Sequence, residues 1–183
     1  MSNIFLASDH HFHHANILNF KRDDGVTPLR SFTDVNHMNE YMVMQHNRVV
    51  GANDKVYFLG DISMAKNAKG FEILSRMNGE KILIKGNHDL APLHVYAQYF
   101  KDVRACHQLD GMLLTHIPIH EESFSRWTLN IHGHLHYRKV NYTGKKIPDP
   151  RYYNVSMECL VDYTPISLEE LKKMAKFNLE NDF

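Results

Sequence analysis

Three short apolar runs in the first half of the chain, each followed by a polar cluster, predict β-strands. They cover residues 3–8, 55–59 and 81–84 and are rich in Ile, Val, Leu, Phe and Tyr. Unbroken apolar runs of this length are typical of strands that are covered on both faces of a sheet. The pattern therefore predicts a buried sheet in this half of the chain.

Segments with helical spacing of apolar side chains separate these runs. Residues 33–50 carry Met, Tyr and Val at about every third or fourth position, with Thr33 as the expected N-cap and Gly51 as the expected C-cap. Residues 64–78 repeat the pattern and stop at Gly79. Strand and helix alternate, which predicts a β-α-β-α-β unit with a parallel sheet and crossover helices.

The second half of the chain has shorter elements and predicts a second sheet. The expected elements are a hairpin formed by residues 103–109 and 112–116, strands at 129–132 and 152–157, and a helix at 167–177. An Asp-Gly pair, which is a frequent hairpin turn, separates the two arms of the hairpin. We therefore predict an α/β fold with four layers, α/β/β/α, that contains two mixed sheets in a single domain spanning residues 1–183.

Composition and charge narrow the class of protein. The 183 residues suffice for one well-packed domain, and 21 Lys and Arg balance 21 Asp and Glu. Balanced charge argues against a protein that grips long nucleic acid, which usually presents a basic face. Cys106 and Cys159 are far apart in the sequence and form no C-x-x-C motif, so we expect reduced structural thiols. The first ten residues lack the basic start of a signal peptide, and no apolar stretch of the sequence has the length of a membrane span. We expect a cytoplasmic protein without a membrane partner; the oligomeric state stays open.

The sequence departs from average composition in its 14 histidines. Histidine is the commonest metal ligand in proteins. Side chains with ligand chemistry follow the expected strands at Asp9-His10-His11, Gly60-Asp61, Gly86-Asn87-His88-Asp89, His116 and His132-Gly133-His134-Leu135-His136. Because sites in open α/β sheets lie beyond the carboxyl ends of strands, we expect these five segments to converge on one pocket.

Taken together, the clusters D-x-H, G-D, G-N-H-D, H and G-H-x-H resemble the calcineurin-like metallophosphoesterase superfamily over about residues 3–157. The start of the chain and its spacing to L-G-D are also similar to small bacterial and phage phosphoesterases. The resemblance implies a two-sheet sandwich and a two-metal site. The implied ligands are Asp9, His11 and His136 for one metal, Asn87, His116 and His134 for the other, and Asp61 as the bridge. His88 would lie near both metals without binding either.

The chemistry of these side chains supports a two-metal site. Two divalent cations repel each other, and a carboxylate such as Asp61 can offset this repulsion by binding both with its two oxygens. Mixed nitrogen and oxygen ligands suit Mn, Fe, Zn, Ni or Co, and we expect Mn. Two such ions about 3.5–4 Å apart clamp an in-line phosphoryl displacement, and a bound water yields hydroxide near neutral pH. His88 is the expected general acid, so His88 and Asp61 are the expected catalytic residues.

The neighbouring histidines are assigned by side-chain alternation. In an extended chain end, Asp9 and His11 would share one side, so His11 is the expected ligand, and His10 is expected to pack or to support a neighbour. His13 is expected to be exposed. His132 is either a third member of the row formed by His134 and His136 or a strand histidine with a satisfied ring, and we favour the second interpretation.

Groups that would contact substrate are harder to assign. The candidates are His14, Asn87 and His88. Cations that could grip phosphate are Arg30, Lys85, Arg126 and Arg138, and the competing interpretation is that each is solvated surface. The segments 19–31, 121–127 and 141–151 are expected to be loops that set specificity, but they carry no readable pattern.

The preferred hypothesis is a phosphodiesterase that acts on a small nucleotide or a similar phosphate ester. A phosphomonoesterase is a close alternative. Further alternatives are a nuclease on DNA or RNA, since Tyr142, Tyr152 and Tyr153 lie near basic residues, and a catalytically silent scaffold with the same fold. The arginine after G-D and the acid that orients the catalytic histidine in protein phosphatases of the superfamily are both missing. This argues against a phosphoprotein phosphatase and leaves the partner of His88 unassigned.

Overall fold

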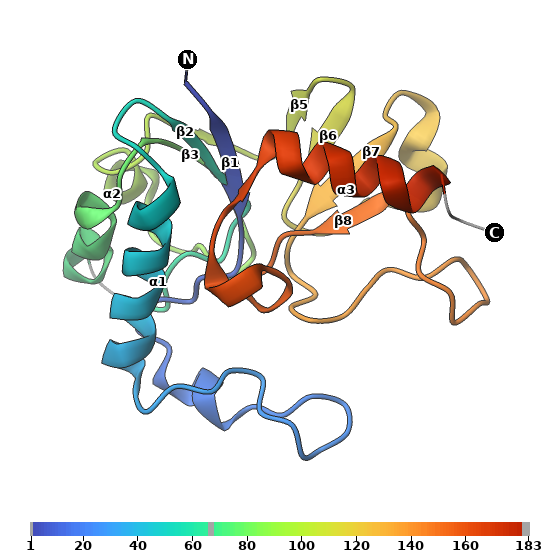
Figure 1. Ribbon diagram of the computed structural model, residues 1–183. Helices are drawn as coiled ribbons and strands as arrows, with labels where there is room; N and C mark the ends of the chain where they lie inside the picture. Colours follow the sequence, from blue (N-terminus) through green and yellow to red (C-terminus); the bar gives the residue numbers. More distant parts are fainter. Residues whose placement is uncertain (1, 66–67, 181–183) are drawn as a thin grey trace.

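The first sheet contains the parallel strands expected in the first half of the chain (Figure 1). This computed structural model describes residues 2–65 and 68–180. The strands are β1 (Ile4–Ala7), β2 (Lys55–Phe58), β3 (Glu80–Ile84), β4 (Asp102–Arg104) and β9 (Ile166–Ser167), in the order β4-β3-β2-β1-β9. β1 to β4 pair in parallel, whereas β9 runs antiparallel to β1. The sheet is therefore mixed, as predicted.

The second sheet is also mixed. Its strands are β5 (His107–Leu109), β6 (Met112–Leu114), β7 (Leu129–His132) and β8 (Tyr152–Asn154), in the order β5-β6-β7-β8. β5 and β6 form an antiparallel hairpin, and β6, β7 and β8 pair in parallel. Asp110 and Gly111 at the hairpin turn have φ of 49° and 78°, which matches the primed turn expected for this dipeptide.

One strand of the predicted hairpin was assigned wrongly at its start. Residues 103 and 104 belong to β4, which pairs in parallel with β3 in the first sheet. Val103 is partly buried against the apolar cluster that contains Leu83 of β3. This packing favours a separate strand in the first sheet over a longer arm of the hairpin. The expected strand at 152–157 also ends early, at Asn154, and Met157 already belongs to a short helical turn.

The helices lie between and after the strands. They are α1 (Val35–Val49), α2 (Leu93–Tyr96), α3 (Leu168–Glu180) and the 3₁₀ helices η1 (Ala15–Asn19), η2 (Ala68–Arg76), η3 (Glu121–Ser125), η4 (Met157–Cys159) and η5 (Val161–Tyr163). The N-cap of α1 is Asp34 and not Thr33, because the Asp34 carboxylate accepts the backbone N–H of His37. The C-cap is Val50 and not Gly51. The helix expected at 64–78 is the 3₁₀ segment η2, and residues 66–67 of that prediction lie outside the described residues.

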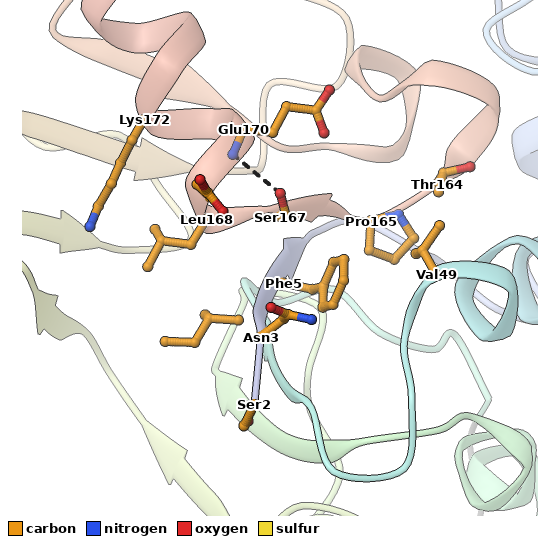
Figure 2. Close-up of a pocket in the computed structure, with 12 residues that line it drawn as sticks. Ser2, Asn3, Phe5, Val49, Thr164, Pro165, Ser167, Leu168, Glu170 and Lys172 are labelled. Atoms are coloured by element: carbon orange, nitrogen blue, oxygen red, sulfur yellow. Dashed lines mark hydrogen bonds between the residues drawn. The ribbon is translucent and has the colours of Figure 1, made fainter.

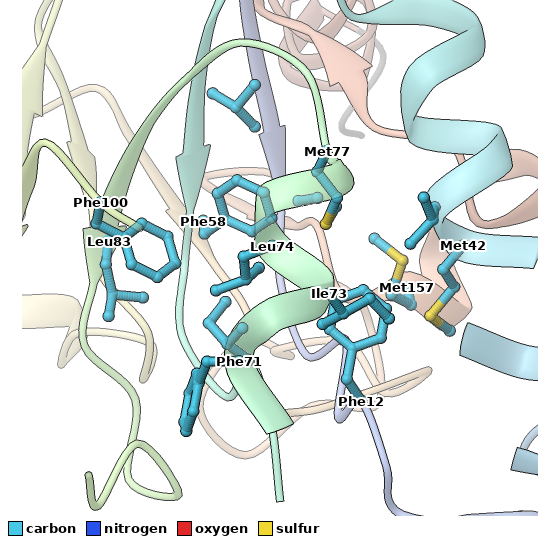
Figure 3. Close-up of a cluster of buried hydrophobic side chains, with 14 of the residues drawn as sticks. Phe12, Met42, Phe58, Phe71, Ile73, Leu74, Met77, Leu83, Phe100 and Met157 are labelled. Atoms are coloured by element: carbon cyan, nitrogen blue, oxygen red, sulfur yellow. The ribbon is translucent and has the colours of Figure 1, made fainter. Parts of the chain in front are cut away.

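Both faces of the central strands are buried, as the unbroken apolar runs predicted. On one face, Phe58 of β2 and Leu83 of β3 share a cluster with Leu74 of η2 (Figure 3). On the other face, Tyr57 of β2 shares a second cluster with Ile131 of β7, so this face meets the second sheet. Successive residues of β2 thus serve two cores, as the two-residue period of a strand requires.

The predicted fold class is confirmed at the level of an α/β chain with two mixed sheets. The four-layer arrangement and the single domain over residues 1–183 stay predictions. Within residues 2–65 and 68–180, no helix has the length and apolar character that crossing a membrane requires.

Candidate metal centre

The segments that follow five strands bring the expected ligands together. Their side chains form two groups of ligand atoms, each group lying within 4.8 Å: Asp9, His11 and His136 in the first, and Asp61, His116 and His134 in the second. The residues of these two groups follow β1, β2, β6 and β7, and the fifth segment, which carries Asn87, follows β3. The convergence expected from strand ends is therefore present, and either group could hold a metal ion.

Asp61 lies between the two groups. Its Oδ2 is 3.7 Å from His11 Nε2 in the first group and 3.4 Å from His116 Nε2 in the second. His11 Nε2 is in turn 3.8 Å from Asp9 Oδ1. One carboxylate thus faces ligand atoms of both groups, which is the position that a bridging ligand requires.

Asn87 joins the second group through its side-chain oxygen. Its Oδ1 is 2.9 Å from His116 Nε2 and 3.0 Å from His134 Nδ1. Asn87 follows β3, so β3 contributes to the site beside β2 and β6. The sequence-based grouping of Asn87 with these two histidines agrees with this geometry.

The donor atoms of the site fit a cation. Among the described residues, Asp9 Oδ1 and both ring nitrogens of His11 are buried without a hydrogen-bond partner. His116 Nδ1 is 2.7 Å from the carbonyl oxygen of Leu59, so this nitrogen carries the proton and Nε2 presents a lone pair. That lone pair faces oxygens of Asp61 and Asn87, which are also acceptors. A cation or an added proton between these atoms would satisfy their converging lone pairs. Without either, burial of the unpaired polar atoms costs folding free energy.

Metal binding should therefore stabilise the folded protein. At a free Mn²⁺ concentration of about 100 times Kd, we expect a gain of about 2.7 kcal/mol, or about 5–10 °C in Tm, over metal-stripped protein for each cation bound. Differential scanning fluorimetry with and without chelator measures the shift. His11→Gln should lose part of it, whereas His13→Gln, at an exposed histidine two positions away, should retain it. Equal shifts in both variants, or no shift with any divalent metal, would contradict the assignment.

The ligand-bearing backbone is left-handed at five positions. Asp9, His11, Asp61, His134 and His136 have φ of 59°, 49°, 55°, 68° and 52°. Residues other than glycine rarely adopt this region, and such conformations cluster at functional sites. The expected extended alternation is therefore wrong, because β1 ends at Ala7 and the pairing of Asp9 with His11 arises from left-handed residues at every second position.

Glycines of the motifs allow the loops to approach one another. A Cβ at Gly133 would overlap the side chains of Ser8 and Asp9, and a Cβ at Gly86 would overlap Asp61. Because Gly133 has no side chain, the backbone N–H of His134 reaches Asp9 Oδ2 at 2.8 Å. Both positions thus require glycine, because the neighbouring loop lies too close to their backbone for a Cβ atom.

Asp89 has a structural role that the sequence did not reveal. Its buried carboxylate accepts the backbone N–H groups of Asp61 at 2.9 Å, Ile62 at 3.0 Å and Gly86 at 2.7 Å. Burial raises the pKa of Asp89, while these hydrogen bonds lower it. The last carboxylate of the G-N-H-D motif therefore ties the loop after β3 to the loop after β2.

A buried pair, Arg30 and Glu158, supports the first group of ligands. Glu158 accepts Arg30 Nε at 2.7 Å and lies 3.0 Å from His136 Nδ1, and Arg30 also donates to the carbonyl oxygens of Asp9 and His10 at 2.5 and 2.7 Å. Burial alone would raise the pKa of Glu158, but Arg30 and His136 lower it to about 2. Arg30 is only 1% exposed, so it is neither a solvated residue nor a phosphate grip. Sequence reasoning missed Glu158, because no local pattern links residues so far apart.

Three further histidines lie where the sequence analysis expected them, two in the interior and one at the surface. His10 is buried, with ring centroids 5.2 Å from Phe12 and 5.0 Å from Phe58, and burial lowers its pKa well below the usual range. His132 is buried, and its Nδ1 is 2.8 Å from the carbonyl oxygen of Gly133. These two therefore pack in the core, and His13 is exposed.

His88 and His14 lie at the open side of the site. The His88 ring is exposed and 5.6 Å from the His11 ring, and its backbone N–H donates to Asp61 Oδ1 at 2.8 Å. The half-buried His14 ring lies 5.8 Å from His11. The remaining candidate cations Lys85, Arg126 and Arg138 are exposed, and Arg138 pairs with Asp23.

A separate pocket of about 580 Å³ opens at the start of β1 (Figure 2). Phe5 of β1, Val49 at the end of α1, and Pro165 and Leu168 near the start of α3 line it. None of the candidate ligands is among its described lining residues, because the ligands follow the opposite end of β1. This pocket has no part in the candidate metal centre.

Comparison with known sequences gives a relative along nearly the whole chain. No family model matches. The uncharacterized protein MJ1445 of Methanocaldococcus jannaschii is 34% identical over 183 aligned positions, which cover 95% of this chain and 92% of that protein. The chain belongs to the MJ1445 family. Gene 66 protein of Mycobacterium phage D29 is also similar to this MJ1445-family chain, with 29% identity over 206 aligned positions that cover 95% of the chain and 96% of the phage protein.

One of the solved structures that resemble this MJ1445-family protein shares its fold over nearly the whole chain. The crystal structure of AQ665 from Aquifex aeolicus, a protein of unknown function, has a TM-score of 0.70 and 26% identity and covers 95% of this chain and 100% of that one. A conserved uncharacterized protein of Streptococcus pneumoniae TIGR4, described as a predicted phosphoesterase, has a TM-score of 0.36 and 16% identity. That second likeness is too low to carry an argument about fold or activity.

Proposed function

We propose that the protein is a hydrolase of phosphoric esters that depends on two divalent metal ions, with a phosphodiester of a small nucleotide or similar compound as substrate. The observation that carries the proposal is the pair of ligand groups that share Asp61 beside the exposed His88. The relation to calcineurin-like metallophosphoesterases and the four-layer sandwich are part of this proposal. A cytoplasmic location and the absence of a membrane partner also remain proposals.

The chain's own residues would divide the work. Asp9, His11 and His136 would hold one cation, Asn87, His116 and His134 the other, and Asp61 both. Bound divalent cations supply charge to the phosphoryl oxygens and make water more acidic. The mixture of imidazole, carboxylate and amide ligands favours Mn, with Fe, Zn, Ni or Co as alternatives.

His88 would donate the proton that the leaving oxygen needs. Its imidazole is exposed, so a substrate can reach it, and its backbone is fixed through the hydrogen bond to Asp61 Oδ1. General acid catalysis requires a titratable group within hydrogen-bond reach of the leaving atom. His14 and Asn87 lie on the same open side and are the further candidates for substrate contact.

The basic residues near Tyr142 support a small substrate over long DNA or RNA. Arg151 forms a two-pronged ion pair with the buried Asp149, with Nη2 2.6 Å from Oδ2 and Nε 3.0 Å from Oδ1. This pairing neutralises one of the cations that a phosphate backbone would need. Lys145 Nζ lies 5.7 Å from the centre of the Tyr142 ring, so this ammonium group already faces an aromatic side chain.

The test compares two matched substrates on protein that has been stripped of metal and reloaded with Mn²⁺. We expect bis(p-nitrophenyl) phosphate to be cleaved faster than p-nitrophenyl phosphate, and chelator to abolish cleavage. Preference for the monoester would favour a phosphomonoesterase. Cleavage of neither, in folded protein that holds two metals, would contradict the proposal and favour the scaffold.

Replacing His88 should separate proton donation from metal binding. His88→Gln should lower kcat by about 10²–10⁴-fold for a diester with a weakly acidic leaving alcohol, and by less for a nitrophenyl leaving group, which needs little protonation. Metal affinity, measured by calorimetry, should not change. The control is His94→Gln, at an exposed histidine on α2. An equal loss for both leaving groups would exclude His88 as the proton donor.

A further inference from the structure

A pocket of about 360 Å³ adjoins His88. Besides His88 and Ser63, it is lined by Met64, Ala65, Phe71, Leu90, Ala91 and Pro92. These residues come from the segment after Asp61, from η2 and from the segment after His88. Its size is at the lower end for ligand pockets, enough for about one ring system.

The walls of this pocket offer carbon surface. Phe71 is 1% exposed and forms the buried base, where its ring packs edge-on against Tyr96 at 5.4 Å. Leu90 at the rim is 82% exposed, so its side chain is accessible to a ligand. The Ser63 hydroxyl is engaged within the protein, since it accepts the backbone N–H of Ala65 at 3.2 Å. A ligand here would therefore meet apolar atoms on most sides.

His88 connects this pocket to the metal centre. Its ring faces His11 on one side, at 5.6 Å, and its side chain lines the pocket. The backbone N–H of Leu90 donates to the carbonyl oxygen of His88 at 2.9 Å, which fixes the rim of the pocket relative to this histidine. A proton donor must contact the leaving oxygen, so the group attached to that oxygen lies on the same side as the donor.

We propose that this pocket binds the leaving group of the substrate and selects an uncharged aromatic group. The inference rests on the proposed function, because it uses His88 as the donor to the leaving oxygen. Among the described residues that line the pocket, His88 alone carries a titratable side chain. A carboxylate or phosphate on the leaving group would lose its hydration against carbon without gaining a Lys or Arg partner among these described residues, whereas a flat ring would bury apolar surface.

The first experiment measures binding without hydrolysis. Phenol is titrated into metal-stripped protein, and the methyl resonances of Met64, Ala65 and Ala91 are followed by NMR. We expect shifts confined to these methyls in the wild type and in Leu93→Lys, and weak or absent shifts in Leu90→Lys. Leu93 is 62% exposed on α2 and does not line the pocket, so it is the matched control. Phenol shifts only at other residues would overturn the proposal.

The second experiment measures selectivity with Mn²⁺-loaded protein. Two methyl aryl phosphodiesters are compared, one with a phenyl and one with a carboxyphenyl leaving group. We expect kcat/KM to favour phenyl by about tenfold in the wild type and in Leu93→Lys, and Leu90→Lys to reduce or invert this preference. If all three proteins hydrolyse the two diesters with the same preference, the pocket does not bind the leaving group, and the proposed hydrolase function stands. Failure to cleave any diester, with two cations bound, overturns the proposed function and the leaving-group assignment with it.

Discussion

Replacing Asp61 with asparagine should abolish hydrolysis and reduce the number of tightly bound divalent cations from two per chain to one at most. The carboxylate faces His11 in one ligand group and His116 in the other, so removal of its charge leaves two cations without a shared anion. Loss of several kcal/mol of transition-state stabilisation corresponds to a fall of about 10³-fold or more in kcat/KM. Metal analysis after dialysis and steady-state kinetics measure the two effects.

The Asp61→Asn variant is designed to keep the fold. Asparagine tolerates the left-handed backbone at this position, where φ is 55°, and its side-chain oxygen can still accept the backbone N–H of His88. The control is Asp34→Asn at the N-cap of α1, because asparagine caps helices as well as aspartate does. Retention of two cations and of activity by Asp61→Asn would show that the two groups do not act as one centre.

Replacing Glu158 with alanine should lower the free energy of unfolding by about 3–5 kcal/mol, because the guanidinium of Arg30 then stays buried without its counterion. The same change should weaken metal binding by about 10–100-fold, since His136 loses the carboxylate that orients its ring. Urea unfolding of metal-stripped protein gives the first quantity, and calorimetry gives the second.

A double replacement separates the two roles of Glu158. Arg30→Met with Glu158→Leu removes both charges and should recover most of the stability, because a buried ion pair can be replaced by well-packed apolar groups. Metal affinity should stay low. Glu169→Ala, at an exposed glutamate on α3, should change stability by less than about 0.5 kcal/mol. Wild-type metal affinity in the double variant would contradict a positioning role.

The pH dependence of stability gives a further check on Glu158. Its pKa falls from 4.5 to about 2 on folding, so the folded state favours the ionised form. This contribution is fully present above about pH 4.5 and is lost as pH falls toward 2. The difference in unfolding free energy between the wild type and Glu158→Gln, both stripped of metal, should therefore shrink over this interval.

The arrangement of β1, β2 and β3 followed from local pattern. Each strand is an unbroken apolar run because both of its faces are buried, and a two-residue period distributes Phe58 and Tyr57 to opposite cores. The convergence of Asp9, Asp61 and His116 also followed, because each residue comes directly after a strand of known direction. These inferences need only the order of residues within a few positions.

Other features depended on contacts between distant segments. β4 belongs to the first sheet, where Val103 pairs with Leu83 of β3. No local pattern distinguishes this strand from a longer arm of the hairpin. The 3₁₀ form of η2 and the cap of α1 at Asp34 likewise reflect which hydrogen bonds the packed chain can complete. Such choices are made by burial in the assembled sheet, and intrinsic propensities are only weak guides to them.

The sequence by itself determined the unbroken apolar strands of the first half, the shorter strands and the D-G hairpin of the second half, and the identity of the side chains that gather at the strand ends. Only the tertiary structure decided how those side chains are held. Arg30 and Glu158 are separated by 128 positions and meet in the interior, and Asp89 reaches the backbone of Asp61 across another loop. The left-handed residues at Asp9 and His11 persist because these surrounding contacts fix them. Periodicity records which side chains are buried, whereas the pairing of buried polar groups depends on the whole fold.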